Sequence, residues 1–307
     1  MSFKFKVDTD GRGMRVDKFL TVMLPQFSRS YIQNMFDESL CFVNGSIVRK
    51  NFILRLGDDV LVKKRPVLKK LAMKPTDIKF LVKNDDYFVI DKTAGIVVEG
   101  SVRGENSICD YLSGLLSEDF VDKERPGIVH RLDRWTSGCL LVARNQNALE
   151  YFQKQFRLRK IKKIYFALVK GILTHKKGMI DSPIGRDSRD RKKMSVSSEN
   201  SGRVAISKFE VVTEYLNCSL VKVEILTGRT HQIRVHMQAI GHPVVGDVLY
   251  GDRKLNATFK SDFGLERQFL HAHVLEFADL RKKWVKVVSE LPEDLQNVIE
   301  KLKCETV

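Results

Sequence analysis

Asp133 is the residue of this chain whose neighbours most favour chemistry. It lies between Arg131 and Arg134, and nearby positive charge favours the ionised form of a carboxylate, which suits a nucleophile or a general base. The apolar runs 126–129 and 139–143 predict a strand, an exposed turn and a second strand around it. Catalytic groups often lie on such loops, but the spacing fits a surface turn with a solvated ion pair equally well.

The elements that must position this carboxylate belong to a long second part of the chain. Apolar residues at every second position predict strands there, and amphipathic patterns predict helices. Strands and helices do not follow one another in regular alternation along the chain. This order favours an α+β fold whose catalytic domain is built on a mixed, mainly antiparallel β-sheet with flanking helices. The expected strands are 86–92, 163–169, 204–212 and 219–225, and the expected helices are 106–115, 147–158 and 229–240.

The first part of the chain has a different pattern. Two helices, 15–24 and 28–36, precede short strands at 41–43 and 59–62, with an Asn-Gly turn signal after the first strand. This order resembles the S-four type of RNA-binding domain, named after a small-subunit ribosomal protein.

Charge supports a boundary between the two parts. Residues 1–74 contain fifteen Lys and Arg against seven Asp and Glu, and a basic, proline-containing stretch follows the last strand. We therefore predict an N-terminal RNA-binding domain over 1–74, with its core at 15–63, and a catalytic domain over 75–307. A solvated charged face is the alternative interpretation. The candidate RNA-binding residues here are Arg29, Lys63, Lys64 and Arg65.

The composition of the whole chain narrows its class. Its 53 Lys and Arg exceed its 38 Asp and Glu by fifteen, which favours a polyanionic partner such as nucleic acid. No run approaches the roughly 20 apolar residues that a membrane span needs, and the first residues lack a signal-peptide core, so we expect a cytoplasmic protein with no membrane partner. The five scattered cysteines form no Cys-x-x-Cys pair, and neither a phosphate-binding loop nor a dinucleotide fingerprint occurs.

Six segments, in order along the chain, resemble the RluA family of pseudouridine synthases, in the branch acting on large-subunit ribosomal RNA. The longest is 125–138, RPGIVHRLDRWTSG. The others are 92–98, KTAGIVV; 163–171, KIYFALVKG; 227–236, TGRTHQIRVH; 242–247, HPVVGD; and, more weakly, 267–272, RQFLHA.

This resemblance implies an enzyme that detaches uracil from ribose, turns it and rejoins it through carbon five, with no metal or other cofactor. It implies that Asp133 is the catalytic carboxylate and that Arg131 fills the space left by the flipped base. It also implies that Tyr165 stacks on the uracil and assists proton removal, and that Arg229 pairs with the carboxylate. Whether Asp133 attacks the ribose anomeric carbon, attacks the uracil ring or abstracts a ribose proton stays open.

Some positions depart from the family pattern or invite another interpretation. Trp135, Thr93 and Glu99 replace more usual residues, without removing a presumed catalytic group. His231 and His236 are five residues apart, a poor spacing for two metal ligands on one helix face, so we expect no metal site. The basic stretch 186–194 resembles a phosphate-contacting loop of the ribosomal branch, and its candidate RNA-binding residues are Arg191 and Lys192.

The expected function is isomerisation of specific uridines, most favourably in 23S ribosomal RNA, by a monomer. The alternatives are the same reaction on transfer RNA and a non-catalytic RNA-binding or ribosome-assembly factor. A glycosidase-like hydrolase is disfavoured because no second acidic motif accompanies Asp133.

Overall fold

The computed structural model divides the chain into two compact units, Met1–Leu71 and Ala72–Val307. It describes residues 2–25, 27, 32–33, 35–36, 39–63, 78–100, 107–123, 125–188, 190, 193–197 and 201–304, and the statements below concern these. The predicted boundary at residue 74 falls within 64–77, outside the described residues.

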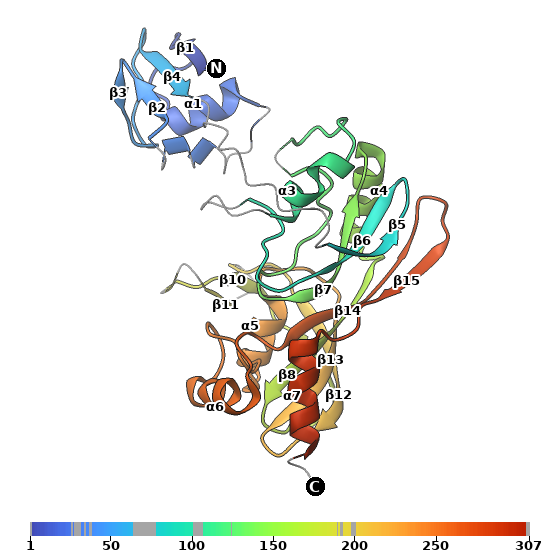
Figure 1. Ribbon diagram of the computed structural model, residues 1–307. Coiled ribbons are helices and arrows are strands. Elements are labelled where there is room, and N and C mark those ends of the chain that lie inside the picture. Colours follow the sequence, from blue (N-terminus) through green and yellow to red (C-terminus); the bar gives the residue numbers. More distant parts are fainter. Residues whose placement is uncertain are drawn as a thin grey trace. The chain divides into compact units, whose positions relative to one another are not determined.

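The first unit is a small antiparallel sheet with a helix on it (Figure 1). The strand order is β1 (Ser2–Lys6), β4 (Asp59–Lys63), β2 (Cys41–Val43) and β3 (Ser46–Ile47), and the helix is α1 (Val16–Met23). Helix α1 buries Val16, Phe19 and Leu20 in a core shared with the sheet. The Asn-Gly turn is confirmed, because Asn44 and Gly45 both have positive φ between β2 and β3. Of the predicted second helix, residues 32–33 and 35–36 are helical, and the rest lies outside the described residues.

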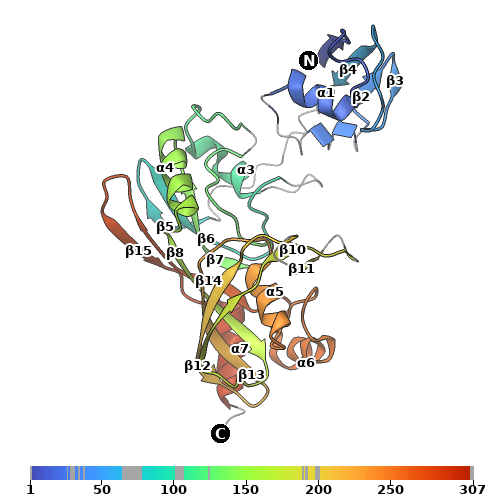
Figure 2. The ribbon, with the colours of Figure 1, turned by 180° about the vertical axis from the view of Figure 1, so that it is seen from behind.

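The second unit is built on a nine-stranded sheet, mixed and mainly antiparallel as predicted. Only β7 and β14 pair in parallel among its described strand pairs, and Figures 1 and 2 show the sheet from two sides. The strands follow the order β5 (Lys79–Lys83), β6 (Tyr87–Lys92), β7 (Ser137–Ala143), β14 (Leu270–Ala278), β8 (Lys162–Lys170), β13 (Cys218–Ile225), β12 (Ile206–Glu214) and β9 (Lys177–Asp181), with β15 (Trp284–Val288) paired to β14. A separate hairpin joins β10 (Ile184–Arg186) and β11 (Met194–Val196).

Helices cover both faces of this sheet, because alternate residues of each strand point to opposite sides. On β8, Tyr165 and Ala167 belong to the same core cluster as residues of α3 (Ile108–Leu112) and α5 (Gln232–Ala239). The opposite side carries α4 (Gln146–Arg157), packed through Phe152, and α7 (Glu293–Cys304), which packs with α6 (Arg253–Phe263). The cavity described below opens on the α5 side.

Two predicted elements need correction. Residues 126–129 form no strand: only Ile128 makes an isolated bridge, and Gly127 turns the chain at φ +72° while its carbonyl accepts from the Ala143 backbone N–H. The helix expected from residue 229 begins at Gln232, because His231 has the left-handed conformation at φ +57°. Residues 229–231 therefore form a turn.

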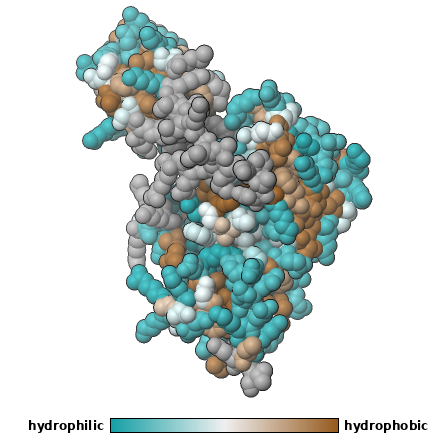
Figure 3. Space-filling model, in the orientation of Figure 1, coloured by the Kyte–Doolittle hydropathy of each residue, from teal (hydrophilic) through white to brown (hydrophobic). Residues whose placement is uncertain are grey.

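Hydrophilic residues make up much of the coloured surface in Figure 3, in agreement with the net charge of +15. Within the described ranges, no helix has both the length and the apolar character needed to cross a bilayer.

Candidate active site

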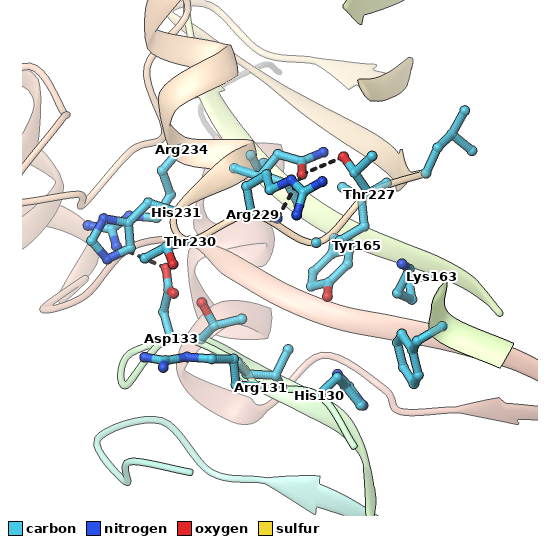
Figure 4. A pocket seen from close by; sticks show the side chains of 18 of the residues that line it. His130, Arg131, Asp133, Lys163, Tyr165, Thr227, Arg229, Thr230, His231 and Arg234 are labelled. Atoms are coloured by element: carbon cyan, nitrogen blue, oxygen red, sulfur yellow. Dashed lines mark hydrogen bonds and ion pairs between the residues drawn. The ribbon is translucent and has the colours of Figure 1, made fainter. Parts of the chain in front are cut away.

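An open cavity of about 510 Å³ collects the residues for which the sequence predicts chemistry. Its walls come from the loop before β7, the end of α4, the start of β8 and the turn from β13 into α5 (Figure 4). Asp133, Arg131, Tyr165 and Arg229 all line it. The volume lies within the usual range for a small-ligand site, and a nucleotide is of that size class.

Asp133 is held by an arginine of α5. The Arg234 Nη1 donates to Asp133 Oδ2 at 2.9 Å, and the same guanidinium donates twice to Asp247, Nε to Oδ2 at 2.6 Å and Nη2 to Oδ1 at 2.9 Å. Arg234 and Asp247 are almost fully buried, whereas the Asp133 side chain is 21% exposed at the cavity. Burial opposes the charged form of Arg234, but its bonds to Asp247 and Asp133 outweigh this and raise its pKa. The arrangement holds the Asp133 carboxylate in an ion pair at the cavity.

The ion pair expected between Arg229 and Asp133 is therefore wrong, because Arg234 occupies that position. The Arg229 Nε donates instead to the Val204 carbonyl at 2.9 Å. Its backbone N–H donates to Gln232 Oε1 at 3.0 Å, which fixes the turn before α5, and Figure 4 shows Arg229 along the wall. Burial lowers the pKa of Arg229, and Arg203 and Arg159 lower it further.

Tyr165 lies on β8 with its ring in the cavity (Figure 4). The residue is 7% exposed, and burial, followed by the charge of Asp133, raises the pKa of its hydroxyl. The ring offers a flat apolar surface to a bound base. Because the hydroxyl keeps its proton at neutral pH, it acts as a hydrogen-bond donor unless a stronger base removes that proton.

Lys92 fixes the loop that carries the carboxylate, a role that was not predicted from the sequence. This side chain is 1% exposed, and its Nζ donates to the carbonyls of Thr93, Ile96 and Arg134 at 2.9, 2.9 and 3.0 Å. Burial and Arg267 lower its pKa to about 7, opposed in part by Asp133. Three carbonyl acceptors require the ammonium form, because only that form has three protons. Lys92 thereby joins the end of β6 to the residue that follows Asp133.

Arg131 stands at the rim with its side chain 62% exposed. Its Nη1 donates to Glu99 Oε1 at 2.9 Å, and Arg125 Nη1 donates to the other oxygen of the same carboxylate at 3.1 Å. Glu99, noted above as a departure from the family pattern, thus holds the arginine expected to replace a flipped base. Trp135, the other departure, is 49% exposed, and its ring packs against Gly95.

The two histidines of the 227–236 segment contact other protein groups. His231 Nδ1 lies 2.9 Å from the Tyr250 hydroxyl, and His236 is fully buried, with its ring nitrogens on Ser207 Oγ and the Ser182 carbonyl. Burial lowers the pKa of both histidines. Across the described ranges, no three His, Cys, Asp or Glu side chains gather as a metal ion would require.

The remaining predicted residues are not at the cavity or are not described. Lys63 belongs to the first unit, where its Nζ lies 4.6 Å from the centre of the Phe42 ring. Arg29, Lys64, Arg65, Arg191 and Lys192 lie outside the described residues. Besides Lys92, the sequence did not identify the site roles of Arg234 and Asp247, although all three residues lie in family-like segments.

Comparison with known proteins identifies the family. Residues 86–239 match the family model described as RNA pseudouridylate synthase. An uncharacterized RNA pseudouridine synthase of Bacillus subtilis, YlyB, is 38% identical over 299 residues, or 94% of each chain. Ribosomal large subunit pseudouridine synthase D of Pseudomonas aeruginosa is 34% identical over 295 residues, 92% of this chain and 90% of that protein.

A solved structure agrees with these matches. The human protein RNA pseudouridylate synthase domain containing 4 aligns with a TM-score of 0.60 at 26% identity, over 73% of this chain and 93% of that one. The sheet, the cavity and the sequence relatives lead to one family: the chain belongs to the RluA-type RNA pseudouridine synthases and is an RNA-modifying enzyme.

Proposed function

We propose that this enzyme converts specific uridines of large-subunit ribosomal RNA to pseudouridine, with Asp133 as the catalytic carboxylate. The observation that carries the assignment of Asp133 is its position: it is the only acidic residue among the described residues that line the cavity, and Arg234 forms an ion pair with it. The substrate class rests on relatives such as the Pseudomonas aeruginosa protein, whose name specifies the ribosomal large subunit.

The chemistry follows from the reaction and the residues. The glycosidic bond from uracil nitrogen one to ribose carbon one must break, and a bond from carbon five to the same ribose carbon must form. Carbon five must lose its proton, and nitrogen one must gain a proton. Asp133 supplies the negative charge, either as a nucleophile or as a base. Arg234 holds it in one orientation through a charge-assisted bond. No atoms are gained or lost overall.

The residues at the rim and on the wall of the cavity are proposed to act in base flipping and in binding of the flipped base. A uridine inside a helix cannot present its glycosidic bond, so the base must leave the stack, and Arg131 is the residue we expect to fill the gap. To do so Arg131 must exchange its bond to Glu99 for contacts with RNA. Tyr165 stacks on the extruded uracil, and its protonated hydroxyl donates to a uracil oxygen or to the Asp133 carboxylate. Arg229 lines the same wall and contacts the nucleotide without pairing with Asp133.

The first unit is proposed to bind RNA as an S-four-type domain. The support is its sheet-and-helix pattern and its excess of basic residues, with Arg29, Lys63, Lys64 and Arg65 as candidate contacts. Arg191 and Lys192 are candidate phosphate contacts of the second unit. We propose that the enzyme acts as a monomer in the cytoplasm.

The test uses purified full-length enzyme and RNA from cells that lack the gene. Large-subunit ribosomal RNA and transfer RNA are separated, and each is incubated with the wild-type protein or with Asp133→Asn. Pseudouridine that forms only in ribosomal RNA and only with the wild type supports the proposal. Formation in transfer RNA alone would overturn the substrate, and turnover by Asp133→Asn would overturn the role of Asp133.

A further inference from the structure

Lys163 is a buried cation for which the reaction described above has no use. It lies on β8 two residues before Tyr165, so both side chains point to the same face, and both line the cavity (Figure 4). The residue is 7% exposed, and no described group accepts a hydrogen bond from its ammonium or forms an ion pair with it. Its Nζ lies over the Phe156 ring, 5.4 Å from the ring centre, in a cation–π contact. A buried charge without a polar partner costs free energy until an anion satisfies it.

Other cations surround this ammonium. Arg157 and Arg159 reach the cavity from the end of α4 and the turn after it, and Arg229 reaches it from the turn before α5. None of these three side chains forms an ion pair with a described carboxylate, and the single lining carboxylate, Asp133, is already bonded to Arg234. Six Lys and Arg thus face one Asp among the lining residues.

The charges of this group act on one another. Burial, followed by Arg159, lowers the pKa of Lys163 to about 8, and Glu224 opposes this only in part. Arg159 also lowers the pKa of Arg229. Like charges that line one cavity destabilise one another, and a bound anion would reduce the repulsion.

We propose that Lys163, with Arg159, Arg157 and Arg229 around it, binds a backbone phosphate of the RNA next to the flipped uridine. This inference rests on the proposed function, since it places the nucleotide in this cavity. The ligand is a phosphodiester because every RNA nucleotide brings one into the site on either side of its ribose. Lys163 then anchors the backbone while Tyr165, on the same strand, faces the base.

The test measures binding rather than turnover. Fluorescein-labelled decauridylate is titrated with the full-length protein at several salt concentrations, for wild type, Lys163→Met, Lys163→Arg and Lys162→Met. Lys162 is the matched control, because it is the adjacent lysine, does not line the cavity and lies 3.8 Å from Glu276. Loss of one phosphate contact should weaken binding about ten-fold and flatten the plot of log affinity against log salt by about 0.7.

We expect both effects in Lys163→Met, and neither in Lys163→Arg or Lys162→Met. If Lys163→Met bound RNA with the affinity and salt dependence of the wild type, the inference would be overturned. An equal loss of affinity in Lys162→Met would overturn it as well. Weaker binding of Lys163→Met with an unchanged dependence of log affinity on log salt would mean that the ammonium contacts a neutral oxygen of the base. That result would also overturn the phosphate contact. If Lys163→Met does not fold, Arg159→Gln on the exposed turn tests the same phosphate. Because no turnover is measured, failure here leaves the assignment of Asp133 standing.

Discussion

At the scale of single residues, the site depends on a chain of charges that begins away from the substrate. Asp247 is buried, and its carboxylate accepts backbone N–H groups of Leu249 and Tyr250 in addition to the Arg234 guanidinium. Arg234 in turn holds Asp133. Neither Asp247 nor Arg234 can move without leaving a buried charge uncompensated, so the position of the Asp133 carboxylate is determined by the core of the unit.

Substitution of the two arginines separates their roles. Arg234→Leu removes one partner of a buried pair and should lower the free energy of unfolding by about 3–5 kcal/mol. Arg229→Leu removes a half-buried side chain with a single neutral acceptor and should cost about 1 kcal/mol. Denaturant unfolding of both variants measures the difference. Equal losses would contradict the view that Arg234, and not Arg229, is the buried partner of the two carboxylates.

The site residues named from sequence and resemblance, Asp133, Arg131, Tyr165 and Arg229, all line one cavity, but Arg234 and not Arg229 is paired with the carboxylate. The pairing was implied by the resemblance, and the 227–236 segment contains two arginines. In the structure the left-handed His231 delays the helix to Gln232, which leaves Arg229 in a turn and places Arg234 within α5, where it reaches Asp133. A single backbone angle of this kind depends on tertiary contacts such as the one between His231 and Tyr250.

At the scale of elements, β7 and β14 form the point where distant parts of the chain meet. The register sets Ser137 opposite His271 and Gly138 opposite Ala272. Gly138 has φ +109°, and a Cβ built there would lie 2.3 Å from the Ala272 carbonyl oxygen. Only glycine permits this approach, directly after the loop that carries Asp133.

Gly138→Ala should therefore destabilise the protein by about 3 kcal/mol, from backbone strain together with overpacking. Gly114→Ala is the matched control, since no atom lies within 4 Å of its added Cβ and its φ is not positive. We expect the control to stay within about 1 kcal/mol of wild type. Thermal unfolding measures both variants, and a wild-type midpoint in Gly138→Ala would refute the close approach of β7 to β14.

The sequence identified β6, β8, β12, β13 and α4 to within a few residues, because their apolar periodicity is strong. It assigned no element after residue 240, although β14 lies in the middle of the sheet. Besides the nearby β15, β14 pairs with β7 and β8, whose paired residues are more than a hundred positions away in the chain. Periodicity reports local structure and gives no information on such pairings.

At the scale of the whole molecule, the excess of positive charge is shared between the two units. The proposed division of labour gives RNA affinity to the first unit and the reaction to the second. Deletion of residues 1–74 should then weaken binding of ribosomal RNA and reduce its salt dependence, because phosphate contacts are lost. Titration at low and high salt tests this, with circular dichroism to verify that the remaining unit is folded. Unchanged affinity at both salt concentrations would remove the RNA-binding role from the first unit.

The measurement that tests the central claim most directly is pseudouridine mapping of total RNA from cells lacking the gene, complemented with wild type or with Asp133→Asn. The substitution removes the charge with little change in volume, so RNA binding should persist while isomerisation stops. We predict that specific uridines of large-subunit ribosomal RNA lose their modification in the deletion and regain it only with the wild-type gene. Restoration by Asp133→Asn, or no site that depends on the gene, would contradict the account.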